Sequence, residues 1–578
     1  MGVTVRVWAP RPERVELESG GRRRLMERGE DGFWQIDAPD LEPGHDYAFA
    51  LDGGPALPDP RSRWQPEGVH GPSRVLDTGS LAWSDAGFEA PPLASGLVYE
   101  LHVGTFTPEG TFDAATRRLD ALADLGVTHV ELMPVAEFPG RHGWGYDGVD
   151  LFAPHHAYGG PEGLARVVDA CHARGLAVLL DVVYNHLGPD GNHLARFGPY
   201  FTDRHATPWG PAVNLDGRGS DEVRRFLCDN ALMWLRDYHF DGLRIDAVHA
   251  IVDTSAVHFL EQLAEEVRTL EATSGRHLVL IAESDLNDPR VIRPPALGGY
   301  GLDAQWNDDF HHAVHAVLTG ERLGYYADFG QLADVAKALD SAFVYDGRYS
   351  RHRGRRHGRA PAGESGRRFV GFVQNHDQVG NRARGERLCH LVSPAGARLA
   401  AAVLLTAPFV PMLFMGEEWG ASTPFLYFTD HVDPSLARRV SEGRRREFAA
   451  FGWDPADVAD PQAPETFARS RLDWDERARP PHRDLLAWHR DLIRLRRSRP
   501  ELCDGRLDRV RTRWDGESGW LVFERGQVVI ACNFSREACS VPLGGTPRTL
   551  LLGSDEGIAI AESTHLPAEA VAIVEMEC

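Results

Sequence analysis

Residues 176–186 read LAVLLDVVYNH, an apolar run that passes directly into polar side chains. Continuous Val and Leu without polar alternation are typical of a strand buried on both faces, as in a parallel sheet. Seven other runs of this kind occur, at 97–103, 127–134, 242–246, 278–283, 302–307, 369–375 and 409–415. The sequence therefore predicts eight strands of parallel sheet.

Amphipathic segments separate these runs, and their periodicity predicts helices. The segments lie at 112–125, 163–174, 221–237, 254–270, 330–339 and 398–405. Strands that alternate with helices form βα units, and eight units close into a (β/α)8 TIM barrel, because closure leaves no exposed sheet edge. An open doubly wound sheet is the alternative, but no Gly-rich dinucleotide or phosphate loop follows any of the strands.

Both ends of the chain have a different pattern of polar and apolar residues. Residues 3–9 alternate as VTVRVWA, and short alternating runs with Gly, Pro and Asp turns recur up to a Pro- and Gly-rich stretch at 53–72. Short β-runs return after the helical segment 484–495. We therefore expect an N-terminal β-sandwich domain at 1–90, the α/β barrel with insertions at 91–500, and a C-terminal all-β domain at 501–578.

Composition excludes several classes of protein. The net charge of −22 disfavours binding to nucleic acid or to anionic membranes. The seven cysteines are scattered and show no Cys-x-x-Cys spacing, which disfavours a disulfide framework and a zinc site. No apolar run reaches the ~20 residues of a membrane span, and the first residues lack signal-peptide features. We expect a soluble, cytoplasmic protein.

Polar residues end four of the predicted strands, at 181–186, 242–246, 281–283 and 373–377. Active sites of barrels lie at the carboxyl ends of the strands, so these residues should converge on one mouth. They include three acids without any serine or cysteine in a nucleophilic setting. A cluster of carboxylates suits the hydrolysis of a glycosidic bond, in which one acid protonates the leaving oxygen and a second carboxylate attacks the sugar carbon.

Two of the acids are predicted to have different protonation states. Arg244 and Asp246 are two residues apart and therefore on the same side of a strand, where the cation would keep Asp246 ionised. Glu283 ends a buried apolar run, where the loss of hydration favours the protonated acid.

Two other interpretations concern charged side chains. Asp181, His186, Asp246 and His376 could instead surround a divalent metal ion, although no His-x-x-Glu or His-x-His spacing supports such a site. The run RHRGRRHGR at 351–359 is the one basic cluster, and we interpret it as a solvent-exposed loop in preference to a ligand clamp.

These strand ends resemble the four short motifs of the α-amylase superfamily, glycoside hydrolase family 13. The matching stretches are DVVYNH at 181–186, GLRIDAVH at 242–249, LIAES at 280–284 and FVQNHD at 372–377. The resemblance implies that Asp246 is the nucleophile, Glu283 the general acid/base and Asp377 the transition-state stabiliser. It also implies that Arg244, His186 and His376 hold the sugar at the cleavage subsite and that Tyr146, followed by Asp147, forms a stacking platform.

Longer stretches, among them NHLGPDGNHL at 185–194 and DAQWNDDFHHAVH at 303–315, resemble the maltooligosyltrehalose trehalohydrolases within this superfamily. That resemblance implies a retaining hydrolase that cleaves the α-1,4 bond next to the terminal trehalose of maltooligosyltrehalose, releasing trehalose and a maltooligosaccharide. It implies no metal or organic cofactor, and it is compatible with action in sequence with a maltooligosyltrehalose synthase. The oligomeric state stays open.

Six further residues are candidates for contacts with the leaving sugars because they follow predicted strands, and loop hydrogen bonding is an equally good explanation for each. They are Trp209, Asp285, Asn287, Asp308, Asp309 and His311. Two alternatives to the hydrolase function stay open. One is a glycogen branching or debranching enzyme of the same superfamily, and the other is a non-catalytic glucan-binding protein.

Overall fold

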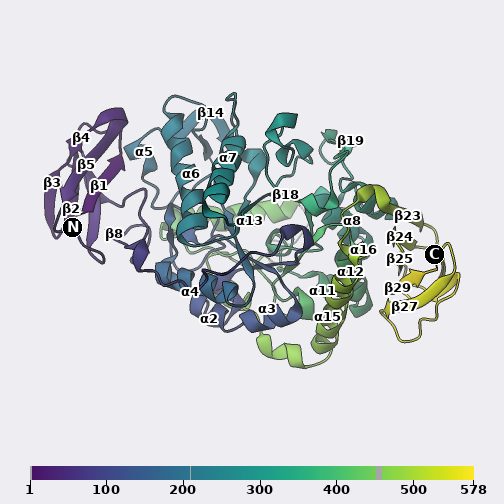
Figure 1. Cartoon of the computed structure of the whole chain (residues 1–578). Helices are drawn as coiled ribbons and strands as arrows, with labels where there is room; N and C mark the ends of the chain where they lie inside the picture. The colour runs from purple at the N-terminus through teal and green to yellow at the C-terminus, as the bar shows by residue number, and fades with distance from the viewer. Residues whose placement is uncertain (1–2, 208–209, 451–457, 578) are drawn as a thin grey trace.

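The computed structural model describes residues 3–207, 210–450 and 458–577. Figure 1 shows small sheets of the N-terminal residues at one end of the molecule, a large α/β body in the middle and the C-terminal sheets at the other end. The body contains a closed barrel of eight parallel strands, which confirms the predicted fold.

The barrel strands are β9 (Val98–Leu101), β10 (His129–Leu132), β13 (Ala177–Val182), β16 (Gly242–Ile245), β17 (Val279–Ala282), β18 (Ala304–Trp306), β21 (Phe369–Gly371) and β22 (Val410–Phe414). Each strand pairs in parallel with the next in chain order, and β22 closes the barrel by pairing with β9. All eight fall inside the runs that the sequence singled out. Their side chains are buried on both faces, which explains the uninterrupted apolar character.

The interior of the barrel is a packed core of strand side chains that includes Val98, Leu179, Ile281, Trp306 and Met412. Helices cover the outside, where they bury one apolar side each. The longer helices are α4 (Gly160–His172), α6 (Ser220–Asp237), α7 (Phe259–Ser274), α8 (Asp308–Thr319), α9 (Leu332–Ser341), α12 (Pro394–Thr406), α13 (Pro434–Ala450) and α15 (His482–Ser498).

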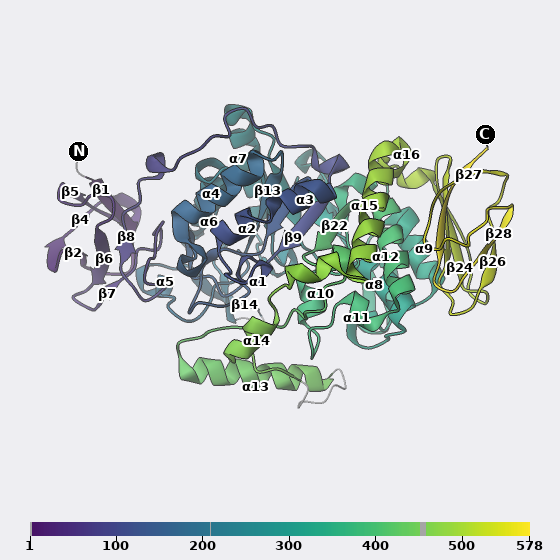
Figure 2. The same cartoon turned by 90° about the horizontal axis from the view of Figure 1, so that it is seen from below.

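Shorter elements fill the connections. The short helices are α1 (Val103–Phe106), α2 (Phe112–Thr116), α3 (Leu119–Leu125), α5 (Leu194–Phe197), α10 (His376–Gly380), α11 (Leu388–Leu391), α14 (Pro464–Arg469) and α16 (Pro500–Cys503). Three two-stranded sheets pair β11 (Ala136–Glu137) with β12 (Asp150–Pro154), β14 (Phe201–Thr207) with β15 (Gly210–Val213), and β19 (Asp346–Ser350) with β20 (Arg355–Gly358). Figure 2 shows α13 and α14 on the outside of the body.

The N-terminal residues form two antiparallel sheets. One contains β1 (Val3–Trp8), β5 (Phe33–Ala38) and β4 (Glu27–Arg28). The other contains β3 (Arg22–Leu25), β2 (Val15–Ser19), β6 (Asp46–Leu51), β7 (Ala56–Leu57) and β8 (Ser73–Arg74). Buried side chains of both sheets, such as Val7 and Leu17, belong to the same apolar cluster. Trp8 meets Tyr200 edge to face at 5.2 Å, so this part also contacts the barrel insertions.

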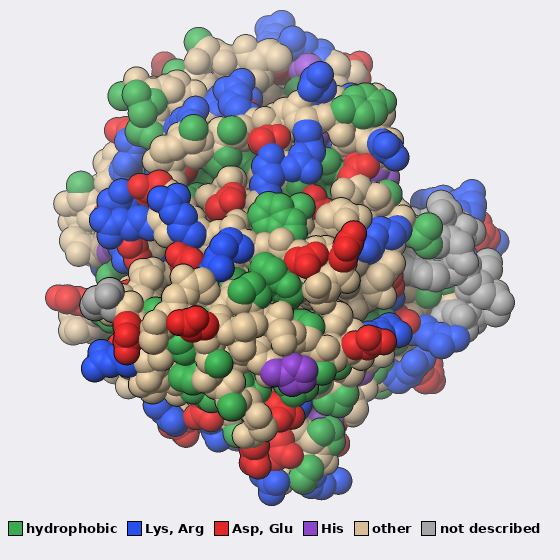
Figure 3. Space-filling model, turned by 90° about the vertical axis from the view of Figure 1, so that its right-hand side faces the viewer, with side chains coloured by type: hydrophobic (Ala, Val, Ile, Leu, Met, Phe, Trp, Pro, Cys, Tyr) green, Lys and Arg blue, Asp and Glu red, His purple; other side chains and the backbone are tan. Residues whose placement is uncertain are grey.

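The C-terminal residues form a five-stranded antiparallel sheet with the order β23 (Val510–Asp515), β24 (Trp520–Arg525), β25 (Val528–Asn533), β29 (Val571–Met576) and β27 (Pro547–Gly553), and a two-stranded sheet of β26 (Cys539–Pro542) and β28 (Ser563–Leu566). Acidic and basic side chains are interspersed over this end of the molecule (Figure 3). Among the described residues, no helix is both long and apolar enough to cross a membrane.

Candidate active site

The three acids singled out in the sequence lie at neighbouring ends of barrel strands. Asp246 follows β16, Glu283 follows β17, and Asp377 is in the first turn of α10 after β21. Because β16 and β17 are paired in register, the residues after them emerge side by side. Residues that follow β13 and β21 in the chain complete the site.

Arg244 contacts two of these acids, Asp246 and Glu283. Its guanidinium is fully buried, and its Nη1 donates to both oxygens of Asp181, at 2.8 and 2.7 Å, and to Oδ1 of Asp246 at 2.8 Å. Its Nη2 forms an ion pair with Oε2 of Glu283 at 3.2 Å. The predicted contact between Arg244 and Asp246 is therefore present. One guanidinium bridges the carboxyl groups of Asp246 and Glu283 and holds them close together.

Glu283 is in an environment that favours its protonated form. Burial, together with repulsion from Asp246 and Asp377, raises the pKa of Glu283 well above its usual value, although Arg244 acts in the opposite direction. The backbone N–H of Ala247 donates to Oε2 of Glu283 at 2.6 Å. Ala247 itself has a φ of 39°, a left-handed conformation that is strained for alanine. This conformation directs its N–H toward Glu283.

A hydrogen-bonded network supports the floor of the site. The Tyr146 hydroxyl contacts Oδ2 of Asp181 at 2.5 Å and Nε2 of His376 at 2.8 Å, and the other ring nitrogen of His376 bonds to Glu100. Burial opposes the charge on His376, but the Glu100 carboxylate raises its pKa to about 9. His376 is thus a buried cation at neutral pH.

Tyr146 reaches this network because of the residue before it. Gly145 has a φ of 99°, and a side chain there would come within 2.2 Å of the carbonyl oxygen of Pro134, so only glycine fits. His186 supports the same segment, since its Nε2 contacts the carbonyl oxygen of Tyr146 at 3.0 Å. Its neighbour Asn185 donates to Oδ2 of Asp246 at 2.7 Å.

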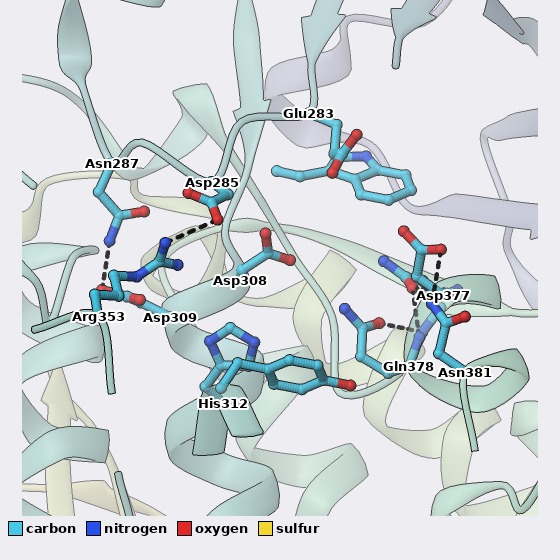
Figure 4. A pocket seen from close by; sticks show the side chains of 13 residues that line it. Glu283, Asp285, Asn287, Asp308, Asp309, His312, Arg353, Asp377, Gln378 and Asn381 are labelled. Carbon is cyan, nitrogen blue, oxygen red and sulfur yellow. Dashed lines mark hydrogen bonds and ion pairs between the residues drawn. The ribbon is translucent and has the colours of Figure 1, made fainter. Parts of the chain in front are cut away.

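Two cavities meet above these residues. One cavity is lined by Trp144, Tyr146, Asp147, His186, Asp246, Ala247, His249, Glu283, Asp377, Asn381, Tyr427, Thr429 and Arg444. The other, shown in Figure 4, is lined by Glu283, Asp285, Asn287, Trp306, Asp308, Asp309, His312, Tyr325, Arg353, Asn375, Asp377, Gln378 and Asn381. We call them the Tyr146 cavity and the Arg353 cavity. Glu283, Asp377 and Asn381 line both, whereas Asp246 lines only the Tyr146 cavity.

Most of the predicted sugar contacts line one of the two cavities, whereas Arg244, His311 and His376 line neither. His311 is fully buried on the inner side of α8, where its ring nitrogens contact the carbonyl oxygen of Val373 and the hydroxyl of Tyr326, each at 2.8 Å. The prediction for His311 is therefore corrected. The neighbouring His312 lines the Arg353 cavity instead.

Asp309 lies at the edge of the Arg353 cavity but has structural partners. Its Oδ2 accepts hydrogen bonds from the backbone N–H groups of Val344 and Tyr345 and from the side chain of Asn287, each at 2.7 Å. The side chain of Asp308 has no such partners among the described residues, and burial raises its pKa to about 7. Trp209 lies outside the described residues.

The structure also brings in residues that the sequence interpretation missed. Arg353 belongs to the basic run at 351–359, which we expected to be exposed, yet Arg353 turns into the cavity and pairs with Asp285 at 3.0 Å. His357 of the same run is buried. Most other residues of the run are exposed, so the prediction fails only for these two. Their position depends on the β19–β20 hairpin, which no sequence signal identified.

The arrangement does not favour the metal interpretation. Between Asp181 and Asp246, where a divalent ion would need to lie, the structure places the guanidinium of Arg244. In the part of the chain that the structure describes, the group of side chains close enough to share an ion is Glu137, His155 and His156, at the β11–β12 sheet. The chemistry available in the cleft is therefore that of carboxyl groups.

Comparison with known proteins agrees with this geometry. Residues 73–198 match a family model described as "Alpha amylase, catalytic domain", and residues 505–573 match a domain of unknown function, DUF3459. In solved structures, the chain is similar to a putative α-amylase from Salmonella typhimurium, with a TM-score of 0.91, 40% identity and coverage of 99% of this chain and 97% of that one.

Curated relatives match over the whole length. A malto-oligosyltrehalose trehalohydrolase from Arthrobacter ramosus is 52% identical, with 99% of each chain covered. One from Saccharolobus solfataricus is 44% identical, with coverage of 98% of this chain and 96% of the relative. Identity of this extent, together with the barrel and its converging acids, shows that the chain belongs to the malto-oligosyltrehalose trehalohydrolase family of α-amylase-type glycoside hydrolases.

Proposed function

We propose that this protein hydrolyses the α-1,4-glucosidic bond next to the terminal trehalose unit of maltooligosyltrehalose, with retention of anomeric configuration, and releases trehalose and a maltooligosaccharide. The observation that carries the proposal is the position of the acids. Glu283 stands where two cavities meet, and Asp246 lines only one of them. A sugar chain that spans both cavities would have its scissile bond beside Glu283.

The mechanism begins with Glu283 as the acid. The Glu283 carboxyl group, whose pKa is raised, donates its proton to the glycosidic oxygen. The bond between this oxygen and the anomeric carbon breaks, and trehalose leaves. The Asp246 carboxylate forms a bond to the anomeric carbon from the opposite face. A water molecule then attacks this carbon, Glu283 takes its proton, and the bond to Asp246 breaks.

Retention follows from the closeness of the two carboxyl groups. Retaining glycosidases hold them about 5–5.5 Å apart, whereas inverting enzymes leave room for a water molecule between them. The contacts of Arg244 with both Asp246 and Glu283 support the closer arrangement. Nη1 of Arg244 also donates to Oδ1 of Asp246 and so orients the carboxylate for the attack. We assign Asp377, which lines both cavities, to stabilisation of the developing positive charge on the sugar.

The two cavities divide the substrate between them. The Tyr146 cavity contains the proposed nucleophile and therefore holds the sugar that is attacked, with Tyr146, Asp147 and His186 around it. Arg244 and His376 act on this sugar through their contacts with Asp246 and Tyr146. The Arg353 cavity then receives the leaving trehalose. Asp285, Asn287 and Asp308 are its proposed contacts, since their carboxyl and amide groups can hydrogen-bond sugar hydroxyls.

The substrate must be supplied by an enzyme that converts the terminal α-1,4 link of a maltooligosaccharide into an α,α-1,1 link, a synthase reaction. We place both steps in the cytoplasm. The six cysteines that the structure describes are all free, which fits a reducing compartment. The net charge of −22 disfavours nucleic acid as a partner.

The test compares two substrates of equal length, maltotetraosyltrehalose and maltohexaose, with product analysis by chromatography. The proposal predicts fast release of trehalose from the first and slow cleavage of the second. Equal cleavage of both would instead indicate a broad amylase, and new α-1,6 branches would indicate a branching enzyme. Binding without any turnover would indicate a glucan-binding protein.

A further inference from the structure

Asp377 is the most exposed of the three acids. Its side chain is 40% exposed, compared with 11% for Asp246 and 15% for Glu283. Arg244 contacts the carboxyl groups of Asp246 and Glu283, whereas Asp377 lies on another element, in the first turn of the short helix α10. The position of its carboxyl group therefore depends on the side chains around α10.

One of these side chains is Asn381, which follows α10 and lines both cavities. Its Nδ2 donates to Oδ1 of Asp377 at 3.3 Å, a hydrogen bond that is drawn in Figure 4. The same carboxyl oxygen lies 3.5 Å from Nε2 of His376. Asn381 and His376 thus limit the rotation of the Asp377 carboxyl group.

The amide of Asn381 has a second partner, Arg444 of α13. Nη2 of Arg444 donates to Oδ1 of Asn381 at 2.6 Å and to the carbonyl oxygen of Gly380 at 2.9 Å. An amide side chain accepts through its oxygen and donates through its nitrogen, and a guanidinium only donates. Because Arg444 binds the oxygen, the nitrogen of Asn381 faces Asp377, and the amide cannot turn over without losing both hydrogen bonds.

Arg444 is itself held by packing and by the helix that carries it. Its guanidinium lies over the ring of Tyr427, 4.6 Å from the ring centroid, and Tyr427 meets Trp144 edge to face at 5.1 Å. The helix α13 lies on the outside of the body (Figure 2), where the hydroxyl of Ser441 donates to Asp460 at 2.7 Å. An insertion outside the regular βα units therefore supplies a side chain to the site.

From these contacts we infer that Arg444 is a positioning residue for the reaction. It fixes the amide of Asn381, and Asn381 in turn holds the Asp377 carboxylate where it stabilises the positive charge that develops on the sugar ring. Arg444 acts through Asn381 and needs no contact of its own with the substrate. The inference rests on the proposed function, in which Asp377 has this role, and adds the residues that hold it in place.

The experiment measures kcat and KM for maltotetraosyltrehalose in Arg444→Met, Asn381→Ala and the double variant of the full chain. Methionine keeps an unbranched side chain that can pack on Tyr427, but it cannot donate a hydrogen bond. We expect kcat to fall about 10- to 100-fold in each single variant, because the carboxylate loses its position. KM should change less than about threefold, because the substrate keeps its own contacts.

The double variant separates action through Asn381 from independent action. If Arg444 acts through Asn381, the double variant should have about the same kcat as Asn381→Ala, since the second change removes nothing further. Arg444→Lys, which keeps a donor, should recover most of the lost rate. Arg438→Met, a change of the same kind at an exposed position of α13, should leave kcat and KM normal.

Three results would overturn the inference. They are a normal kcat in Arg444→Met, a double variant whose loss is the product of the two single losses, and a rise in KM with unchanged kcat, which would show that Arg444 binds the sugar itself. Failure of the proposed function is distinguishable, since it would appear in the unchanged protein as the absence of trehalose among the products. The same variants are then compared on the glucan that the unchanged protein does cleave, because Asp377 acts on the attacked sugar whatever the leaving group.

Discussion

Arg244 contacts three carboxyl groups at the mouth of the barrel while remaining fully buried. A buried cation is tolerated only when anions compensate it, and here the compensating anions include the proposed nucleophile. The same guanidinium therefore serves stability and chemistry. For Glu283, in contrast, burial outweighs the attraction of Arg244 and raises the pKa well above its usual value.

Replacing Glu283 by glutamine removes the proton that the leaving oxygen needs but keeps the size of the side chain. We expect kcat for maltooligosyltrehalose to fall by about 10²–10⁴-fold, the usual contribution of a general acid. A nitrophenolate leaving group needs less protonation, so the rate of the first step should fall less with a substrate that carries it. Equal rate losses in that step, measured by rapid mixing with both substrates, would contradict the role of Glu283.

The pair of His376 and Glu100 should make stability depend on pH. The pKa of His376 is raised to about 9 from 6.5, so its protonation stabilises the fold fully below pH 6.5 and this contribution is lost as the pH rises through 9. Glu100→Gln removes the anion that holds the proton. The variant should be less stable than the unchanged protein by about 3 kcal/mol at pH 6, with a smaller difference at pH 9.5.

Thermal unfolding at the two pH values measures this difference. Glu556→Gln, a change of the same kind at an exposed position, is the control and should have little effect at either pH. A destabilisation by Glu100→Gln that is equal at pH 6 and pH 9.5 would show that His376 does not carry the charge.

Sequence reasoning located residues on strands better than residues on helices and insertions. The contact of Arg244 with Asp246 follows from the two-residue period of a strand. On α8, the choice between His311 and His312 depends on the rotation of the helix, which the mixed polar and apolar stretch NDDFHHAVH at 307–315 does not determine. Arg353 was missed because its position depends on contacts with Asp285 and Asp328, which are distant in the chain.

At the scale of elements, all eight barrel strands were predicted, because burial on both faces requires uninterrupted apolar runs. Helix ends were less accurate. The helix predicted from residue 254 begins at Phe259, where the side chain of Asp253 accepts a hydrogen bond from the Phe259 N–H and His258 caps the first turn. The limits of the three domains stay predictions.

A substitution of Gly242 in β16 tests how tightly the barrel strands pack. A side chain at this position would come within 2.4 Å of Cγ2 of Val279 and 2.5 Å of its carbonyl oxygen on the neighbouring strand. We expect Gly242→Ala to lower the free energy of unfolding by about 1–3 kcal/mol, the usual cost of overpacking. The strand also carries Arg244 and leads to Asp246, so activity should fall as well.

The control for Gly242 is Gly443 in α13, where an added side chain meets no atom of the described residues within 4 Å. Alanine there should stabilise the protein by about 0.5–1 kcal/mol, because it restricts the unfolded chain and favours the helix. Denaturant unfolding of both variants measures the two changes. Equal stability of the two variants would contradict the packing that the structure shows at β16.

At the scale of the whole molecule, Arg525 attaches the C-terminal sheet to the barrel. The side chain is buried, and its Nη1 donates to the carbonyl oxygen of Thr406 at the end of α12. Its Nη2 donates to the carbonyl oxygens of Glu501, Leu502 and Asp504. Arg525→Ala leaves these acceptors without a partner. We expect a loss of about 2–4 kcal/mol and a separate unfolding transition of the C-terminal sheet in calorimetry.

Arg511→Ala, at an exposed position on β23 of the same sheet, is the matched control and should leave a single transition at the normal temperature. The hydrolytic activity of Arg525→Ala below its first transition should remain normal, since Arg525 is not among the residues that line the two cavities. A normal melting profile for Arg525→Ala would contradict its role in attaching the sheet.

The most direct test of the complete account follows the hydrolysis of maltotetraosyltrehalose by ¹H NMR during the first minutes, before the anomers interconvert. The account predicts trehalose as the leaving product and a new reducing end that appears first as the α-anomer, because two successive displacements by Asp246 and water retain the configuration. A reducing end that appears first as the β-anomer, or the absence of trehalose, would contradict it.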